Sequence, residues 1–176
     1  MGMDTDTDTD DIDAGRLLLR PVSRDVALAL LDGRRPAGLS FAAGYPSEFS
    51  LETMQIAAGP SAARGFGPFF MVRKADEAVI GELGAMFDPD RGTAHVGYTV
   101  VQPSWGRGYA TEAVRALLAH LRTRPGVRRV LAETLTGHTA SRRVMEKAGM
   151  TPAGERVTQM DGRTVSLVVY ELASVG

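Results

Sequence analysis

The stretch QPSWGRGYATEA (residues 102–113) places a short glycine-rich loop directly before a run of helix-forming residues. The first N–H groups of a helix lack partners, and the helix dipole adds partial positive charge there, so a helix start attracts anions. Gly106 and Gly108 have no Cβ and would let the backbone approach phosphate oxygens, while Arg107 adds a full positive charge. The stretch therefore predicts a phosphate-binding loop, although an ordinary turn with a good helix start accounts for the same residues.

Two common nucleotide-binding loops fit this stretch poorly. The nucleoside-triphosphate loop needs a glycine followed by lysine, and the chain contains no such pair. The dinucleotide fingerprint would need glycine where Thr111 stands, and it belongs to an early parallel β-α-β unit. The residues alone therefore leave the ligand of this loop open.

The patterns around the loop predict one α+β domain. The segment 109–122 carries a single apolar stripe, as expected of a helix packed on a sheet. Alternating or β-branched runs predict strands, and capping residues mark the other helices. We expect strands over residues 16–22, 69–74, 78–87, 93–101, 127–134 and 164–172, and helices over 24–31, 51–58, 109–122 and 139–148. This order predicts a central sheet in one mixed α/β domain, residues 16–176.

Composition limits the remaining function classes. The 176 residues include no cysteine, which excludes disulfides, thiolate metal sites and a cysteine nucleophile, and we expect no metal. Six aspartates lie within residues 4–13, so we expect residues 1–15 to form a disordered acidic tail. Basic residues are dispersed and aromatic residues few, which argues against nucleic-acid binding. The chain has no apolar run of membrane-spanning length and no signal peptide, so we expect a cytoplasmic protein that binds no membrane.

Two motifs together resemble a known family. The segment VGYTVVQPSWGRGYATEAVRALLAHL (residues 96–121), followed by VLAETLTGHTASRRVMEKAGM (residues 130–150), closely resembles the GCN5-related N-acetyltransferase (GNAT) superfamily. The nearer match is its RimJ/RimL-type branch of ribosomal-protein-alanine acetyltransferase-like enzymes. The resemblance spans residues 16–172, and its diagnostic part is residues 95–150. It implies the GNAT fold: a twisted, mostly antiparallel sheet of about six or seven strands, about four helices and one splayed strand pair.

The resemblance implies an acetyl-CoA site. The loop backbone at Gly106, Arg107, Gly108, Tyr109, Ala110 and Thr111 would hold the CoA pyrophosphate. The backbone of Thr99, Val100 and Val101 would pair with the pantetheine arm, which would enter the splayed gap. His138 stands where the second motif usually has asparagine, so its contact with the cofactor is an open question. Pro103 likewise replaces a residue that often contributes to the loop.

Direct attack of an amine on the thioester is the expected chemistry, because the chain has no cysteine to carry the acetyl group. The resemblance places N–H groups near Val100 and Val101 at the carbonyl oxygen. Ser141 is the expected proton donor to the leaving thiolate, since Met145 occupies the position where many relatives have tyrosine. Alternatively, Ser141 has only a structural role in the first turn of its helix.

Three residues compete as general base. Glu82 lies in an apolar strand, where burial would raise its pKa; His95 lies on the next strand, and Glu133 on the strand after the loop helix. If Phe87 pairs with Thr93 across the DPDRG turn, Glu82 lies opposite Tyr98, and His95 faces the other side. Each of the three residues also has an ordinary structural role open to it, and a water chain or no dedicated base remains an alternative.

The acceptor side is less specific. Phe41, Tyr45 and Glu48 lie where this fold carries its substrate-side helices, so they are candidate acceptor contacts, with ordinary loop packing as the alternative. The expected function is acetyl transfer from acetyl-CoA to a primary amine, either a protein N-terminus or a small molecule. A CoA-binding sensor without catalysis is the alternative, and we expect a monomer or homodimer.

Overall fold

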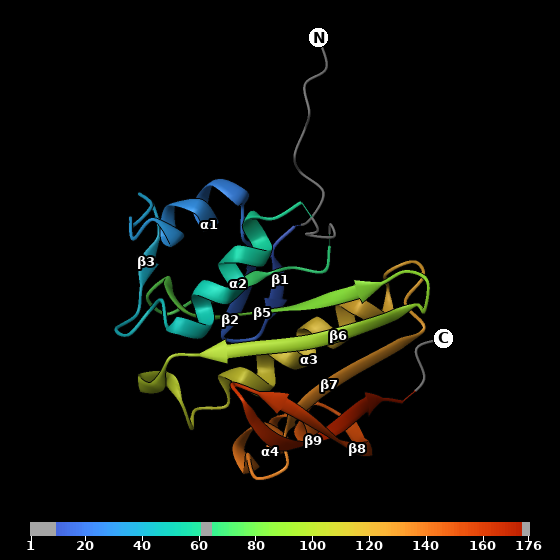
Figure 1. The fold of residues 1–176 in the computed structure, drawn as a ribbon. Coiled ribbons are helices and arrows are strands. Elements are labelled where there is room, and N and C mark those ends of the chain that lie inside the picture. Colours follow the sequence, from blue (N-terminus) through green and yellow to red (C-terminus); the bar gives the residue numbers. More distant parts are fainter. Residues whose placement is uncertain (1–9, 61–64, 174–176) are drawn as a thin grey trace.

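The computed structural model describes residues 10–60 and 65–173, which form one twisted mixed sheet flanked by helices (Figure 1). The sheet order is β1-β2-β4-β5-β6-β7-β9-β8, with β3 beside β5. The nine strands are β1 (Ile12–Ala14), β2 (Leu17–Pro21), β3 (Ser40–Phe41), β4 (Phe69–Arg73), β5 (Ala78–Asp88), β6 (Thr93–Val100), β7 (Arg129–Leu135), β8 (Met150–Met160) and β9 (Arg163–Leu172). Only the β6–β7 and β3–β5 pairs are parallel among the described strands. The predicted α+β class is confirmed, and the two short strands β1 and β3 account for the count above seven.

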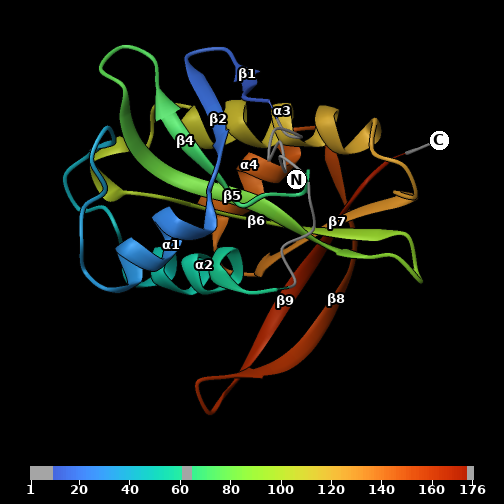
Figure 2. The same ribbon diagram turned by 90° about the horizontal axis from the view of Figure 1, so that it is seen from above.

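Helices cover both faces of the sheet (Figure 2). One face carries α1 (Arg24–Leu31) and α2 (Glu48–Ala58), which pack together, and the other carries α3 (Tyr109–Arg122) and α4 (Thr139–Lys147). The stripe predicted for α3 is buried at Ala113, Val114, Leu117, Leu118 and Leu121. Helix α2 begins earlier than expected because Ser47, rather than Ser50, is its N-cap, and the two serines form a capping box.

The parallel strands β6 and β7 separate partway along their length. Their ladder joins Thr93–Val96 to Arg129–Ala132, whereas β6 continues to Val100 and β7 to Leu135 without further pairing to each other. This is the splayed pair expected from the resemblance. The last residues of β6 therefore present one unpaired backbone edge toward β7.

The register between β5 and β6 differs by one residue from the expected one. Asp88, not Phe87, pairs with Thr93, so Glu82 lies opposite Thr99 rather than Tyr98. The Asp88 carboxylate accepts the N–H groups of both Asp90 and Arg91 at 3.1 Å and closes the turn from within the strand. Since side chains alternate across a strand, this correction moves Glu82 to the opposite sheet face from Tyr98.

The two ends of the chain also depart from expectation. The disordered tail was predicted to reach residue 15, but β1 pairs with β2, and Ala14 is buried; residues 1–9 lie outside the described residues. At the other end, only residues 164–172 were delineated as a strand, and β8 adds a long hairpin partner. The β8–β9 hairpin projects past the body of the sheet (Figure 2).

Candidate active site

The glycine loop has the backbone form that its sequence predicts. Gly106 and Gly108 adopt left-handed conformations, with φ of 72° and 82°. Gly108 is the N-cap of α3, and no side chain caps that helix start. A Cβ at Gly106 would meet no heavy atom within 4 Å among the described residues. The loop thus leaves open space in front of unpaired N–H groups, which suits an oxyanion such as phosphate.

Arg16, in the turn between β1 and β2, clamps this loop. Its Nε donates to Glu112 Oε1 at 2.8 Å, and its Nη2 donates to the Arg107 carbonyl at 2.6 Å. The Arg16 guanidinium also lies over the Tyr109 ring, 4.5 Å from the centroid. One side chain therefore joins the backbone of the loop to the first turn of α3. Nothing in the local sequence pattern linked Arg16 to a loop some ninety residues away.

The unpaired edge of β6 carries the Val100 N–H that faces the splay. The Val101 N–H donates to the Ile80 carbonyl at 2.9 Å, on the β5 side. Because backbone groups of an antiparallel strand alternate in direction, the Val100 N–H points the other way, toward β7, beyond the end of the ladder. Of the two amides expected to polarise a carbonyl, Val101 is already used, and Val100 is the one that fits. The Val100 carbonyl accepts the Trp105 indole N–H at 2.6 Å.

A hydroxyl pair bridges the splay on the α4 side. Tyr98, on β6, donates its hydroxyl to Ser141 Oγ, in the first turn of α4, at 3.2 Å. Ser141 is largely buried, and this bond leaves its own hydroxyl hydrogen free to be donated. Burial raises the pKa of Tyr98, and the bond to Ser141 opposes that shift, so Tyr98 stays neutral.

His138 is the exposed N-cap residue of α4 and makes no side-chain cap. Its Nδ1 lies 3.5 Å from Thr134 Oγ1, at the limit of a hydrogen bond. It lines a shallow hollow of about 580 Å³ together with Gly137 and residues of β7 and β9. Its position beside the open end of the splay agrees with the predicted cofactor contact, which stays a prediction.

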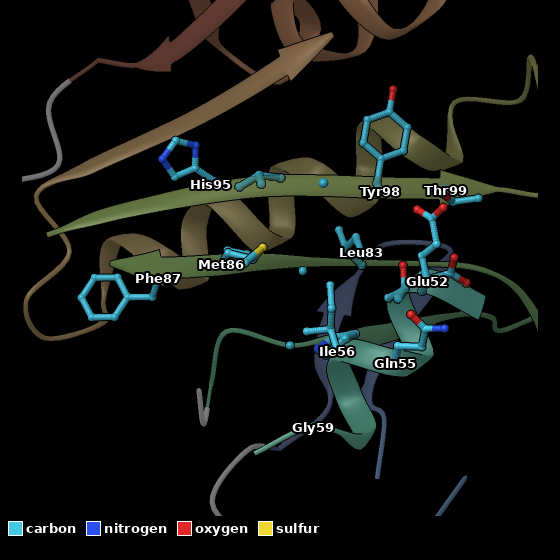
Figure 3. A pocket seen from close by; sticks show the side chains of 18 residues that line it. Glu52, Gln55, Ile56, Gly59, Leu83, Met86, Phe87, His95, Tyr98 and Thr99 are labelled. Carbon is cyan, nitrogen blue, oxygen red and sulfur yellow. The ribbon is translucent and has the colours of Figure 1, made fainter. Parts of the chain in front are cut away.

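A groove of about 720 Å³ lies on the opposite face of the sheet, between α2 and strands β5 and β6 (Figure 3). Its lining includes both Glu82 and His95, which the corrected register places on one face. Glu52 reaches from α2 toward Thr99 in Figure 3, while His95 lies at the far end beside Met86 and Phe87. The two predicted bases are therefore brought to one groove, but at opposite ends of it.

Glu82 is a buried carboxyl without a hydrogen bond. Its side chain is 1% exposed, and neither carboxylate oxygen has a partner among the described residues. Burial raises its pKa to about 7, with a smaller opposing effect from the nearby Tyr45 and Ser50 hydroxyls, which do not reach hydrogen-bond geometry. The Tyr45 hydroxyl is also buried and unpartnered, and burial raises its pKa far above the ordinary value. A base poised near neutrality and lacking a partner is a candidate for proton abstraction.

The third predicted base is engaged elsewhere. Both carboxylate oxygens of Glu133 accept hydrogen bonds from Arg156, at 2.9 and 2.6 Å. This pairing lowers the pKa of Glu133, which makes it a weak proton acceptor and removes it from the candidates.

The residues predicted to contact the acceptor do not line this groove. Phe41 stacks on Tyr45, with ring centroids 5.4 Å apart, so both act in packing, and Tyr45 lies behind Glu82. Glu48 is exposed in the first turn of α2. The helix contributes Glu52 and Ile56 instead, one and two turns further along. Glu52 and Ile56 are four residues apart, so helical periodicity places them on the same face of α2.

Two other kinds of site are missing from the described part of the chain. No group of three or more histidine, aspartate or glutamate side chains is placed to hold a metal ion within residues 10–60 and 65–173. Over the same ranges, no helix combines the length and apolar character needed to cross a membrane.

A cradle for an anion, an open strand edge and a buried base on the far face together define an acyl-transfer class of site. Residues 16–151 match the family model described as Acetyltransferase (GNAT) domain. The match spans most of the chain, and this protein belongs to that family.

The individual relatives are distant. The uncharacterized N-acetyltransferase p20 of Bacillus licheniformis is 27% identical over 107 residues, 59% of this chain and 60% of that protein. The uncharacterized N-acetyltransferase YjdG of Bacillus subtilis is 28% identical over 87 residues, 49% of this chain and 52% of that protein. The chain therefore spans less than two thirds of either relative.

Solved structures share the fold across nearly the whole chain. A GNAT-family acetyltransferase from Bordetella pertussis has a TM-score of 0.68 at 24% identity, covering 94% of this chain and 100% of that one. A RimL ribosomal L7/L12 alpha-N-protein acetyltransferase in complex with coenzyme A has a TM-score of 0.67 at 18% identity, covering 92% and 97%. The GNAT fold is thus confirmed, and a RimL neighbour agrees with the RimJ/RimL-type resemblance.

Proposed function

We propose that this protein is an N-acetyltransferase that moves an acetyl group from acetyl-CoA directly to a primary amine. The observation that carries the proposal is Glu82, a buried, unpartnered carboxyl with a pKa of about 7. It lies opposite Thr99, one residue before the unpaired Val100 amide that faces the splay. A base for the amine, on β5, and a donor for the carbonyl oxygen, on β6, are therefore offset by one residue across the β5–β6 ladder.

The residues at the other end of the splay fit the cofactor. The open space and free N–H groups at Gly106 and Gly108 suit the pyrophosphate, with Arg107 exposed beside them. The unpaired edge of β6 suits an extended arm with amide groups, which would pair as an added strand does. These residues would hold acetyl-CoA, which supplies the activated acetyl group.

The chain's own residues handle one proton on each side of the reaction, and solvent exchanges the others. Glu82 accepts the proton that the bound ammonium loses, so that the amine nitrogen is free to attack the acetyl carbon. The Val100 N–H stabilises the negative charge that builds on the carbonyl oxygen as the C–N bond forms. Ser141 donates its hydroxyl hydrogen to the sulfur as the C–S bond breaks, and Tyr98 replaces that hydrogen through the existing bond and recovers its own from solvent. The nitrogen releases its second proton to solvent as the amide forms. The products are the N-acetyl amine and free CoA.

Binding and turnover are tested separately. Acetyl-CoA should raise the melting temperature, and free thiol should appear when an amine acceptor is added. Gly106→Leu should abolish the thermal shift, because the new side chain enters the phosphate space. Gly33→Leu is the matched control: Gly33 has the same φ of 72° and equally open surroundings, so the folding penalty is shared and acetyl-CoA binding is kept.

The two outcomes that contradict the proposal differ. An unchanged melting temperature at millimolar acetyl-CoA would overturn the cofactor assignment. A normal thermal shift with no thiol release from any of a panel of peptides, polyamines, aminoglycosides and monoamines would favour the CoA-binding sensor instead.

A further inference from the structure

The groove on the α2 face has an acidic end and an apolar end. Glu82 and Glu52 lie at the end beside Thr99, where β6 opens toward the splay. At the other end, Met86 and Ile56 expose 66% and 43% of their surfaces, an unusual exposure for large apolar side chains that share one groove. Four residue steps along β5 separate Glu82 from Met86, which is about 13 Å at the usual rise per residue.

The floor between these ends carries no side chain. Gly84 of β5 and Gly97 of β6 pair directly across the ladder, on the same face as Glu82 and Met86. A Cβ at Gly97 would meet no heavy atom within 4 Å in the described part of the structure, and the residue does not need a left-handed backbone. Packing and backbone conformation therefore do not require glycine at position 97. Because Gly97 has no side chain, the middle of the groove is open.

Charge near the apolar end is already neutralised. Among the described residues, His95 is the only titratable side chain that lines this end, and an imidazole is no carboxylate partner for an ammonium. Two carboxylates on the neighbouring strands already have partners: Glu133 is paired with Arg156, and Asp88 is paired with Arg91 and with the N–H groups of its own turn. A second ammonium lying along the floor would meet glycine backbone and methionine, and would lose water on the side facing the floor without gaining an anionic partner.

We propose that the acceptor is a monoamine whose single ammonium lies at the acidic end, against the exposed Glu52 and over the buried Glu82, and whose uncharged apolar body lies over Gly97 against Ile56 and Met86. This inference rests on the proposed acetyl transfer and excludes polyamines as preferred acceptors. Gly97 then determines specificity, because any side chain there would occupy the place of the body. An apolar small amine and a polypeptide N-terminus that begins with an apolar residue both have this chemistry.

Matched amines test the charge requirement. Hexylamine and hexamethylenediamine have the same carbon chain and differ in the distal ammonium. Measured by thiol release, kcat/KM for hexylamine should be at least about tenfold higher than for hexamethylenediamine. The second ammonium of the diamine would lose water on the groove side without gaining an anionic partner. Equal or better use of hexamethylenediamine or spermidine would overturn the inference while leaving acetyl transfer intact. If no amine causes thiol release, both this inference and the proposed function are overturned.

Gly97→Phe tests the place of the body. The variant should lower kcat/KM for hexylamine about tenfold or more, keep kcat/KM for ethylamine, which is too short to reach Gly97, and keep the acetyl-CoA thermal shift. Gln159→Phe, which places the same ring on the exposed end of β8, is the control and should change none of these values. Equal losses for hexylamine and ethylamine, or no loss for hexylamine, would overturn the assignment of Gly97.

A peptide arm distinguishes the two sources of the acceptor. A tripeptide amide that begins with leucine presents the same head and body as part of a polypeptide. A higher kcat/KM for the tripeptide than for hexylamine would identify a polypeptide N-terminus, and the reverse order a small amine. Either order supports the monoamine class, provided that Gly97→Phe removes the preference.

Discussion

Replacing Glu82 by glutamine should make the protein more stable at high pH while lowering its activity. The pKa of Glu82 is about 7 in the folded protein, against 4.5 for an ordinary glutamate. At 1.36 kcal/mol per pKa unit, ionising this buried group lowers the free energy of unfolding by roughly 3 kcal/mol. Glutamine has nearly the same shape and no charge, so it removes that loss.

The sign and the pH window follow from which state binds the proton. Between pH 4.5 and 7 the folded protein holds a proton that the unfolded chain has released, so raising the pH through this window destabilises the folded state. The loss is about 1 kcal/mol at pH 5 and about 3 kcal/mol at pH 8. The stability difference between Glu82→Gln and the wild type should therefore change by about 2–3 kcal/mol between these two pH values, in favour of the variant.

Denaturant unfolding at pH 5 and pH 8 measures this change directly. Glu133→Gln is the control, because the pKa of Glu133 is lowered by Arg156, and this exposed pair should shift stability by under about 1 kcal/mol in the opposite direction. Turnover of Glu82→Gln should fall by about two orders of magnitude or more, and wild-type kcat/KM should rise with pH to a plateau above about 7. A Glu82→Gln stability difference that is the same at both pH values would refute the reasoning.

The remaining predictions concern the splay and the loop. Ser141→Ala should lower kcat about tenfold or more with little change in the KM for acetyl-CoA, and Tyr98→Phe should lower kcat less; unchanged kcat in both would remove the hydroxyl pair from catalysis. Arg16→Gln should raise the KM for acetyl-CoA several-fold with kcat nearly kept, because the glycine loop loses its clamp. Arg20→Gln, which breaks a similar surface ion pair with Asp11, is its control, and an equal effect in both variants would show that the clamp acts only on stability.

Local signals predicted the conformation of the glycine loop and of α3 well. The glycine loop, the start of α3 and its apolar stripe depend on residues that are neighbours in sequence, so their conformations follow from backbone preferences and helical periodicity. The splay between β6 and β7 came from the family resemblance, since no local rule gives the point at which a ladder ends. Arg16 and Tyr98 were missed as functional residues because their partners, Glu112 and Ser141, are distant in sequence.

The β8 strand was missed for a different physical reason. Almost all of its residues are exposed, so it lacks the apolar alternation that marks a strand packed on a core. Its pairing with β9 also shifts between Pro152 and Gly154, two residues that rarely occur in strand interiors. Only the long ladder with β9 makes this segment a strand.

The one-residue register error at the Asp88 turn had the largest consequence for the proposed mechanism. In the expected register, Glu82 would share a face with Tyr98, and a buried carboxylate beside a phenol would accept its hydrogen bond and lose basicity. In the observed register, Leu83 lies opposite Tyr98, and Glu82 faces α2. The proposed base and the hydroxyl pair are thus on opposite faces of the sheet. An amine entering from the α2 side would lose its proton there, while the thiolate would receive one from the α4 side, so neither group can neutralise the other before the acetyl group moves.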